Sequence, residues 1–175
     1  MKVVTASIST PPRRREIDAT VGLLIFLGAT AMLFAALLLA YAVLRAQTPV
    51  WPPAGTGSLP RLLLSVNTLV LLAASVALRR RRPWPALALA LAFLILQIVA
   101  WGQAVSVGLR PASGAFGSVF FALSGFHALH VAGGIVALAV VLARGATAER
   151  LRLVRGYWDF VLVVWLVVYA AVCVA

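Results

Sequence analysis

The chain has 175 residues, of which 63% are hydrophobic, and its mean hydropathy is +1.06. A soluble domain of this length is far less apolar, so these values exclude one and indicate an integral membrane protein. The formal net charge of +11 does not indicate nucleic-acid binding, because the arginines stand at the ends of apolar segments, where they set membrane topology.

Five intervals with few or no charges are long enough to cross a bilayer as helices, since about 20 apolar residues span a hydrocarbon core of ~30 Å. The first follows a short polar arm over residues 1–18, and a proline-rich outer connector over 46–60 leads to the second. We therefore predict an all-α fold, an integral membrane bundle with a single domain over 19–175. Its transmembrane helices are expected at roughly 19–45, 59–79, 84–109, 113–144 and 153–175.

The basic residues indicate how these helices are oriented in the membrane. One side would hold the arm, the turn at 79–82 and the segment 144–155, which together contain 12 of the 15 Lys and Arg residues. The other side would hold the remaining three, Arg45, Arg61 and Arg110. The positive-inside rule then places the N-terminus in the cytoplasm and the C-terminus outside. Three tryptophans fall near the predicted interfaces, as in an aromatic belt: Trp51, Trp84 and Trp158.

Polar side chains inside a span are costly in hydrocarbon, so they are the first candidates for function. Thr30 and Gln97 fall near the middle of the first and third predicted helices, and Asn67 falls in the outer half of the second. Asp159 lies about one turn inside the cytoplasmic end of the fifth, where we expect it to pair with Arg155 one turn earlier. Its alternative role is to collect protons or to contact lipid.

The only two histidines, His127 and His130, share a face of the fourth predicted helix because they are three residues apart. Small residues at fourfold spacing flank that face and would let another helix approach closely: Ser124, Ala128 and Ala132. We interpret both imidazoles as hydrogen-bonded packing groups at this contact. Two histidines on one face cannot ligate one haem from opposite sides, and no third histidine is present for a metal site. A proton or ion pathway lined by Gln97 and the two histidines, as in a small transporter, stays open.

Six motifs in order extend from about residue 19 to the C-terminus. They are FLGATAMLFAALLLAYAVLR (26–45), WPPAG (51–55), NTLVLLAAS (67–75), Gln97 with Trp101, GSVFFALSGFHALHVAGG (117–134) and GYWDFVLVVWLVVY (156–169). In this order and topology they resemble subunit III of the haem-copper respiratory oxidases. The resemblance implies a five-helix short form that lacks the two N-terminal helices of longer relatives.

The resemblance also implies a role. The chain would be a non-catalytic accessory subunit of a terminal oxidase that reduces oxygen to water, in the plasma (inner) membrane of a prokaryote. It would pack against subunit I, with subunit II in the same complex, and bind phospholipid. It would hold no cofactor itself, so that haem and copper reside in the partner subunits. In the family, subunit III also supports proton uptake and protects the oxidase from inactivation during turnover. An accessory subunit of nitric oxide reductase, which has similar helices, is the alternative within the same superfamily.

The chain departs from the family at positions that usually hold titratable groups. Thr30 and Ala100 stand where glutamates are usual, and Asp159 and Leu162 stand where a histidine and an aspartate are usual. The resemblance therefore extends to the scaffold and its contacts rather than to a proton relay. No catalytic or metal-binding residue is expected. The candidate interface, lipid-contacting or buried polar residues are His127, His130, Gln97, Trp101, Thr30, Asn67, Asp159, Arg155 and Trp158.

Overall fold

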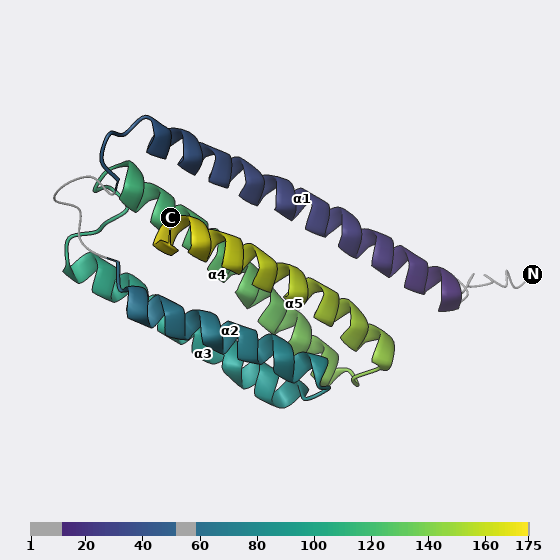
Figure 1. The fold of residues 1–175 in the computed structure, drawn as a ribbon. Coiled ribbons are helices and arrows are strands. Elements are labelled where there is room, and N and C mark those ends of the chain that lie inside the picture. Colours follow the sequence, from purple (N-terminus) through teal and green to yellow (C-terminus); the bar gives the residue numbers. More distant parts are fainter. Residues whose placement is uncertain (1–11, 52–58, 175) are drawn as a thin grey trace, which may run out of the picture.

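The computed structural model describes residues 12–51 and 59–174, which form a bundle of long helices (Figure 1). The helices are α1 (Pro12–Ala46), α2 (Arg61–Arg79), α3 (Pro83–Ser106), α4 (Ala115–Ala143) and α5 (Ala148–Tyr169), followed by the short π-helix η1 (Ala170–Val174). Five helices in the described part of the chain are long and apolar enough to cross a membrane. The predicted all-α fold with five transmembrane helices is confirmed. Residues 1–11 of the expected polar arm, and the WPPAG motif beyond Trp51, lie outside the described residues.

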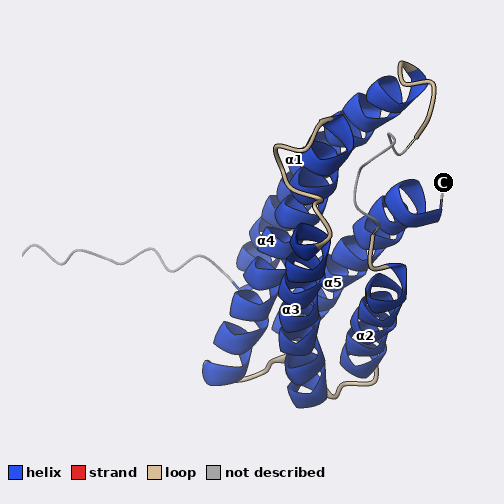
Figure 2. Cartoon of the chain, turned by 90° about the vertical axis from the view of Figure 1, so that its left-hand side faces the viewer, coloured by secondary structure: helices blue, strands red, loops and turns tan. Residues whose placement is uncertain are grey.

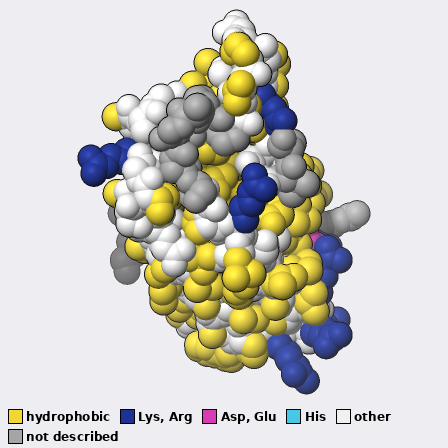
Figure 3. Space-filling model, turned by 60° about the vertical axis from the view of Figure 1, so that its left-hand side comes forward, with side chains coloured by type: hydrophobic (Ala, Val, Ile, Leu, Met, Phe, Trp, Pro, Cys, Tyr) yellow, Lys and Arg dark blue, Asp and Glu magenta, His cyan; other side chains and the backbone are white. Residues whose placement is uncertain are grey.

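The helices do not pack equally. The α2–α3 pair has the most extensive contact, and α5 packs against both α4 and α2. In contrast, α1 lies along one side of the bundle against α4 and α5, as Figures 1 and 2 show from two directions. The N-terminal end of α1 and the C-terminus of the chain lie at opposite ends of the bundle (Figure 1). Apolar side chains form most of the face in Figure 3, with Lys and Arg as separate groups, as expected for a surface in contact with lipid.

Two helices end in the same hydrogen-bonded motif, in which one residue takes a left-handed backbone conformation. At the end of α3, Gly108 has φ 92° and the N–H of Leu109 donates to the carbonyl of Ala104 at 2.9 Å. The motif stops α3 at Ser106, three residues before the predicted end. At the end of α2 the left-handed position is held by Arg81, with φ 58°, and the N–H of Arg82 donates to the carbonyl of Ala77 at 2.9 Å.

Two helices begin earlier than the sequence pattern suggests. The first helix, α1, starts at Pro12 inside the predicted arm, and proline suits the first helical position because its missing N–H has no intrahelical partner there. The fifth, α5, starts at Ala148 rather than near residue 153, because Thr147 caps it. The N–H of Arg150 donates to the Thr147 hydroxyl at 3.3 Å. Apolar periodicity alone does not reveal such polar first turns.

A close contact between α4 and α5 lies at Gly134. A Cβ atom at this glycine would lie 2.9 Å from Cε1 of Tyr157 and 3.3 Å from Cζ2 of Trp158, which is closer than ordinary carbon contacts. Trp158 is consequently only 2% exposed. The prediction that Trp158 belongs to an aromatic belt at the interface is wrong, because its ring is buried against α4. Trp84, at 67% exposed, does have the exposure expected of such a belt.

Candidate functional site

A buried pair of amides joins α2 to α3 in the middle of the bundle. The Nδ2 of Asn67 donates to the Oε1 of Gln97 at 2.9 Å, and the two side chains are 0% and 1% exposed. The second polar atom of each amide, Asn67 Oδ1 and Gln97 Nε2, has no partner among the described residues. The pair therefore couples two helices in an apolar interior, where each unpaired polar atom has a free-energy cost.

His127 lies in an aromatic enclosure made by three different helices. Its ring centroid is 4.7 Å from that of Trp165 on α5, 5.7 Å from that of Phe93 on α3 and 6.5 Å from that of Phe34 on α1. The imidazole is 1% exposed, and its Nε2 has no partner among the described residues. These contacts are compatible with the predicted packing role of His127. The prediction also expected a hydrogen-bonded imidazole, and Nε2 makes no such bond to a described residue.

His130 shares a helix face with His127 but lies in a different environment. It is half-buried at the junction of α1, α4 and α5, with its ring 5.4 Å from that of Phe34. Its Nδ1 lies 2.7 Å from the carbonyl oxygen of Phe126 on the same helix, and its own carbonyl accepts a hydrogen bond from the Tyr157 hydroxyl at 2.7 Å. The two histidines therefore do not converge on a shared ligand position.

Two indoles in the spans, those of Trp101 and Trp165, pack between helices and also donate one hydrogen bond each. Trp165 Nε1 donates to the Thr68 hydroxyl on α2 at 2.9 Å. Trp101, half-buried, donates from Nε1 to the Ser124 hydroxyl at 3.0 Å, and Ser124 in turn donates to the carbonyl of Phe120 at 2.6 Å. The small-residue seam predicted on α4 is thus in contact with α3 at Ser124. Gly125, one residue further on, faces open space.

Thr30 is buried on α1 together with Phe34 and Tyr41, and these three side chains form one seam along the helix. Near the C-terminal end of α1, the Tyr41 hydroxyl donates to the carbonyl of Ala171 at 2.7 Å and accepts from Trp51 Nε1 at 3.2 Å. Ala171 lies in η1, within the last turn of the helix, where carbonyl groups have no intrahelical partner. Tyr41 was not among the residues predicted from the sequence. The signal that could have identified it is an aromatic ring with a polar hydroxyl near the end of a span.

Asp159 does not pair with Arg155 as predicted. Its Oδ1 lies 3.0 Å from the Nη2 of Arg79 at the end of α2, whereas Arg155 Nε donates to the carbonyl of Leu151 at 3.2 Å. In a helix, an arginine four residues before an acid is the less favourable order. Arg79 lies on α2, so this preference for one order along a single helix does not apply to its pair with Asp159. The ion pair is half exposed at the arginine-rich end of the bundle and links α2 to α5.

The buried polar side chains are amides, hydroxyls, indoles and one fully enclosed imidazole. Within residues 12–51 and 59–174, no group of three or more His, Cys, Asp or Glu side chains could hold a metal ion. Among the carboxylates whose side chains the structure describes, Asp18 and Glu149 lie in the first two turns of α1 and α5, and Asp159 pairs with Arg79 at the end of α2. This arrangement can hold helices together at fixed positions.

The chain is similar to several curated proteins over most of its length. It is 31% identical to cytochrome c oxidase subunit 3 of Synechocystis sp., with 86% of this chain and 73% of that protein covered. It is 33% identical to the probable cytochrome c oxidase subunit 3 of Nocardia farcinica, with coverage of 87% and 86%. The subunit from Oncorhynchus mykiss is also 33% identical, with coverage of 93% and 71%. No protein-family model matches the chain.

Proposed function

The chain belongs to the cytochrome c oxidase subunit 3 family, and from this membership we propose that it is an accessory subunit of a haem-copper terminal oxidase. The observation that carries the proposal is the similarity to oxidase subunits over 86–87% of the chain. Haem and copper would reside in the partner subunits, and the complex would lie in the plasma membrane of a prokaryote. Neither the buried amides nor the two histidines would take part in electron transfer.

The packing of α1 supports a partner on this side of the bundle. Only 11% of its membrane-spanning stretch is buried within the chain, compared with 44% for the last span. Exposed apolar side chains are compatible with lipid, but so small a contact holds a long helix poorly in place. We propose that subunit I packs against α1 and the neighbouring face of α4, with phospholipid filling the remaining surface.

The transporter alternative has little support from the site. Gln97 and His127 are enclosed by aromatic and aliphatic side chains rather than open to a path, and His130 faces α1 instead of Gln97. The three relatives are named as subunits of cytochrome c oxidase, which supports an oxidase rather than a nitric oxide reductase as the complex that contains this chain.

Purification of the tagged chain from its native membrane tests the proposed function. We expect haem-bearing polypeptides to copurify in mild detergent and to show oxidase activity in the presence of a reduced donor. A stable, monodisperse chain that brings down no haem protein would overturn the proposal.

A matched pair of substitutions tests the interface. Met32→Trp adds bulk to α1 at a side chain that is 76% exposed, and Ile98→Trp makes a similar change on α3 at a side chain that is 63% exposed. We expect Met32→Trp to reduce the amount of copurified haem protein and Ile98→Trp to leave it unchanged. The reverse result would place the partner on the α2–α3 side.

A further inference from the structure

Helices α2, α3, α4 and α5 pack around a common centre, while α1 lies along one side (Figures 1 and 2). At mid-depth, Asn67 on α2 is bonded to Gln97 on α3. The ring centroid of His127 on α4 lies 4.7 Å from that of Trp165 on α5. Trp165 is bonded in turn to Thr68, the neighbour of Asn67 on α2. These contacts bring side chains from all four helices to one level of the bundle.

The contacts between the antiparallel helices α3 and α4 place Gln97 at the level of His127. Phe93 on α3 contacts the His127 ring, with 5.7 Å between the ring centroids. Farther along α3, Trp101 donates to Ser124, which lies one turn before His127 on α4. Gln97 lies one turn after Phe93 and one turn before Trp101, on the same face of α3. Its side chain therefore lies between these two contacts, beside the part of α4 that holds His127.

Three polar atoms at this level have no hydrogen-bond partner among the described residues: Asn67 Oδ1, Gln97 Nε2 and His127 Nε2. None of their side chains is more than 1% exposed. The amide oxygen can only accept a hydrogen bond and the amide nitrogen can only donate one, whereas the imidazole nitrogen does either, according to its tautomer. The centre of the bundle thus presents one acceptor, one donor and one adaptable atom, from three different helices.

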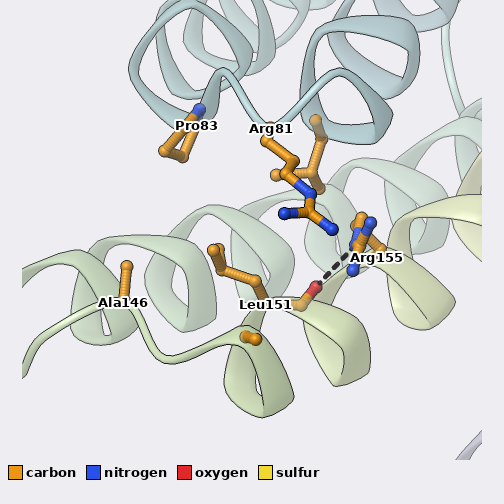
Figure 4. A pocket seen from close by; sticks show the side chains of 7 residues that line it. Arg81, Pro83, Ala146, Leu151 and Arg155 are labelled. Atoms are coloured by element: carbon orange, nitrogen blue, oxygen red, sulfur yellow. Dashed lines mark hydrogen bonds between the residues drawn. The ribbon is translucent and has the colours of Figure 1, made fainter.

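Polar groups at the ends of the helices can be hydrated from outside the membrane, but these central atoms cannot. Arg81 is exposed and Arg155 is half-buried beside a cavity of about 180 Å³ at the arginine-rich end of the bundle (Figure 4). The hydrocarbon core around the middle of the helices contains no water. A partner for the three central atoms must therefore be bound inside the bundle, since leaving them unpaired in an apolar interior is costly.

We propose that the centre of the bundle binds one water molecule between Asn67, Gln97 and His127. The water donates to Asn67 Oδ1, accepts from Gln97 Nε2 and uses a third position for His127 Nε2. Buried waters typically make about three such hydrogen bonds to groups that have no other partner. The adjacent turn of each helix contributes a small buried side chain, Ala100 on α3 and Ser124 on α4, rather than a bulky one. The water joins α4 to the α2–α3 pair by hydrogen bonds, which aromatic packing alone does not provide.

Electron cryomicroscopy of the chain with its copurifying subunits, at a resolution that shows ordered water, tests the site directly. We expect a density peak within hydrogen-bonding distance, about 2.7–3.2 Å, of Asn67 Oδ1, Gln97 Nε2 and His127 Nε2. Clear side-chain density without such a peak would overturn the proposal, and so would a direct bond between Gln97 and His127. This test uses the parent protein and does not depend on the stability of any variant.

A double-variant cycle in SDS unfolding provides a second test. Asn67→Leu and His127→Phe each replace one polar partner of the water with an apolar side chain. If both residues hold the same water, the second substitution costs less once the first has been made. We expect the change in the unfolding equilibrium constant of the double variant to be about tenfold smaller than the product of the two single changes.

Ser75 provides the matched control. It lies on α2 two turns after Asn67, is buried, and its Oγ also has no partner among the described residues. The changes from Ser75→Ala and His127→Phe should multiply to within about twofold, because Ser75 does not reach the water. Independent effects in the Asn67 cycle, or equal coupling in both cycles, would count against the site.

Discussion

The contact at Gly134 gives a prediction whose size follows from the structure. In Gly134→Ala the new Cβ would lie 2.9 Å from Cε1 of Tyr157 and 3.3 Å from Cζ2 of Trp158, whereas carbon atoms in contact prefer about 3.5–4.0 Å. Tyr157 cannot retreat easily, because its hydroxyl is bonded to the carbonyl of His130 at 2.7 Å. We expect this overpacking to cost about 1–3 kcal/mol.

Gly125→Ala is the matched control on the same helix, since nothing lies within 4 Å of its added Cβ. Both variants gain the same helix propensity, about 1 kcal/mol for alanine over glycine, so this gain cancels in the comparison. Unfolding of the detergent-solubilised protein by added SDS, followed by tryptophan fluorescence, measures the difference. Gly134→Ala should be less stable than Gly125→Ala by about 1–3 kcal/mol. Equal stabilities, within about 0.5 kcal/mol, would show that α4 and α5 are not in this close contact.

Three further predictions concern the polar contacts. Asn67→Leu and Gln97→Leu should each destabilise the protein by about 1–3 kcal/mol in SDS unfolding, and the double variant should lose less than the sum; additive losses would contradict the amide pair. Tyr41→Phe removes the hydrogen bond to η1 and should speed amide hydrogen exchange near the C-terminal end of α1. Exchange at the same rate as in the parent protein would contradict a role for this bond. Replacing both His127 and His130 with Asn should lower the yield of assembled oxidase while leaving protons pumped per electron unchanged. Normal assembly with abolished pumping would reveal a relay instead.

Hydropathy and arginine positions predict the five spans, because lipid imposes a length and a polarity on each crossing helix. The same pattern identifies Asn67, Gln97 and His127, since polar groups at mid-span depth in a bundle are usually turned inward. All three are indeed buried. Depth along a helix can thus be read from the sequence.

The direction in which a side chain points around its helix cannot be read in this way. Trp158 has the depth of an interface residue, but Gly134 on another helix leaves room for its ring, so that it is buried. Asp159 has a basic residue one turn away, but its partner comes from 80 residues earlier in the chain. Both outcomes depend on how α2, α4 and α5 pack together, which is a long-range property. The start of α5 at Thr147 is a local property, but it depends on a polar cap rather than on apolar periodicity.

The hydrogen bond from Tyr41 to Ala171 has a consequence for biogenesis. Its two residues are 130 positions apart, and α1 packs mainly against α4 and α5, the last helices to leave the ribosome. At about 5–20 residues per second, roughly 6 to 26 s pass between synthesis of the tyrosine and synthesis of its acceptor. During that interval α1 waits in the bilayer while the α2–α3 hairpin can already close. An insertase or an early-arriving partner therefore has its best opportunity to hold α1 before the chain is finished.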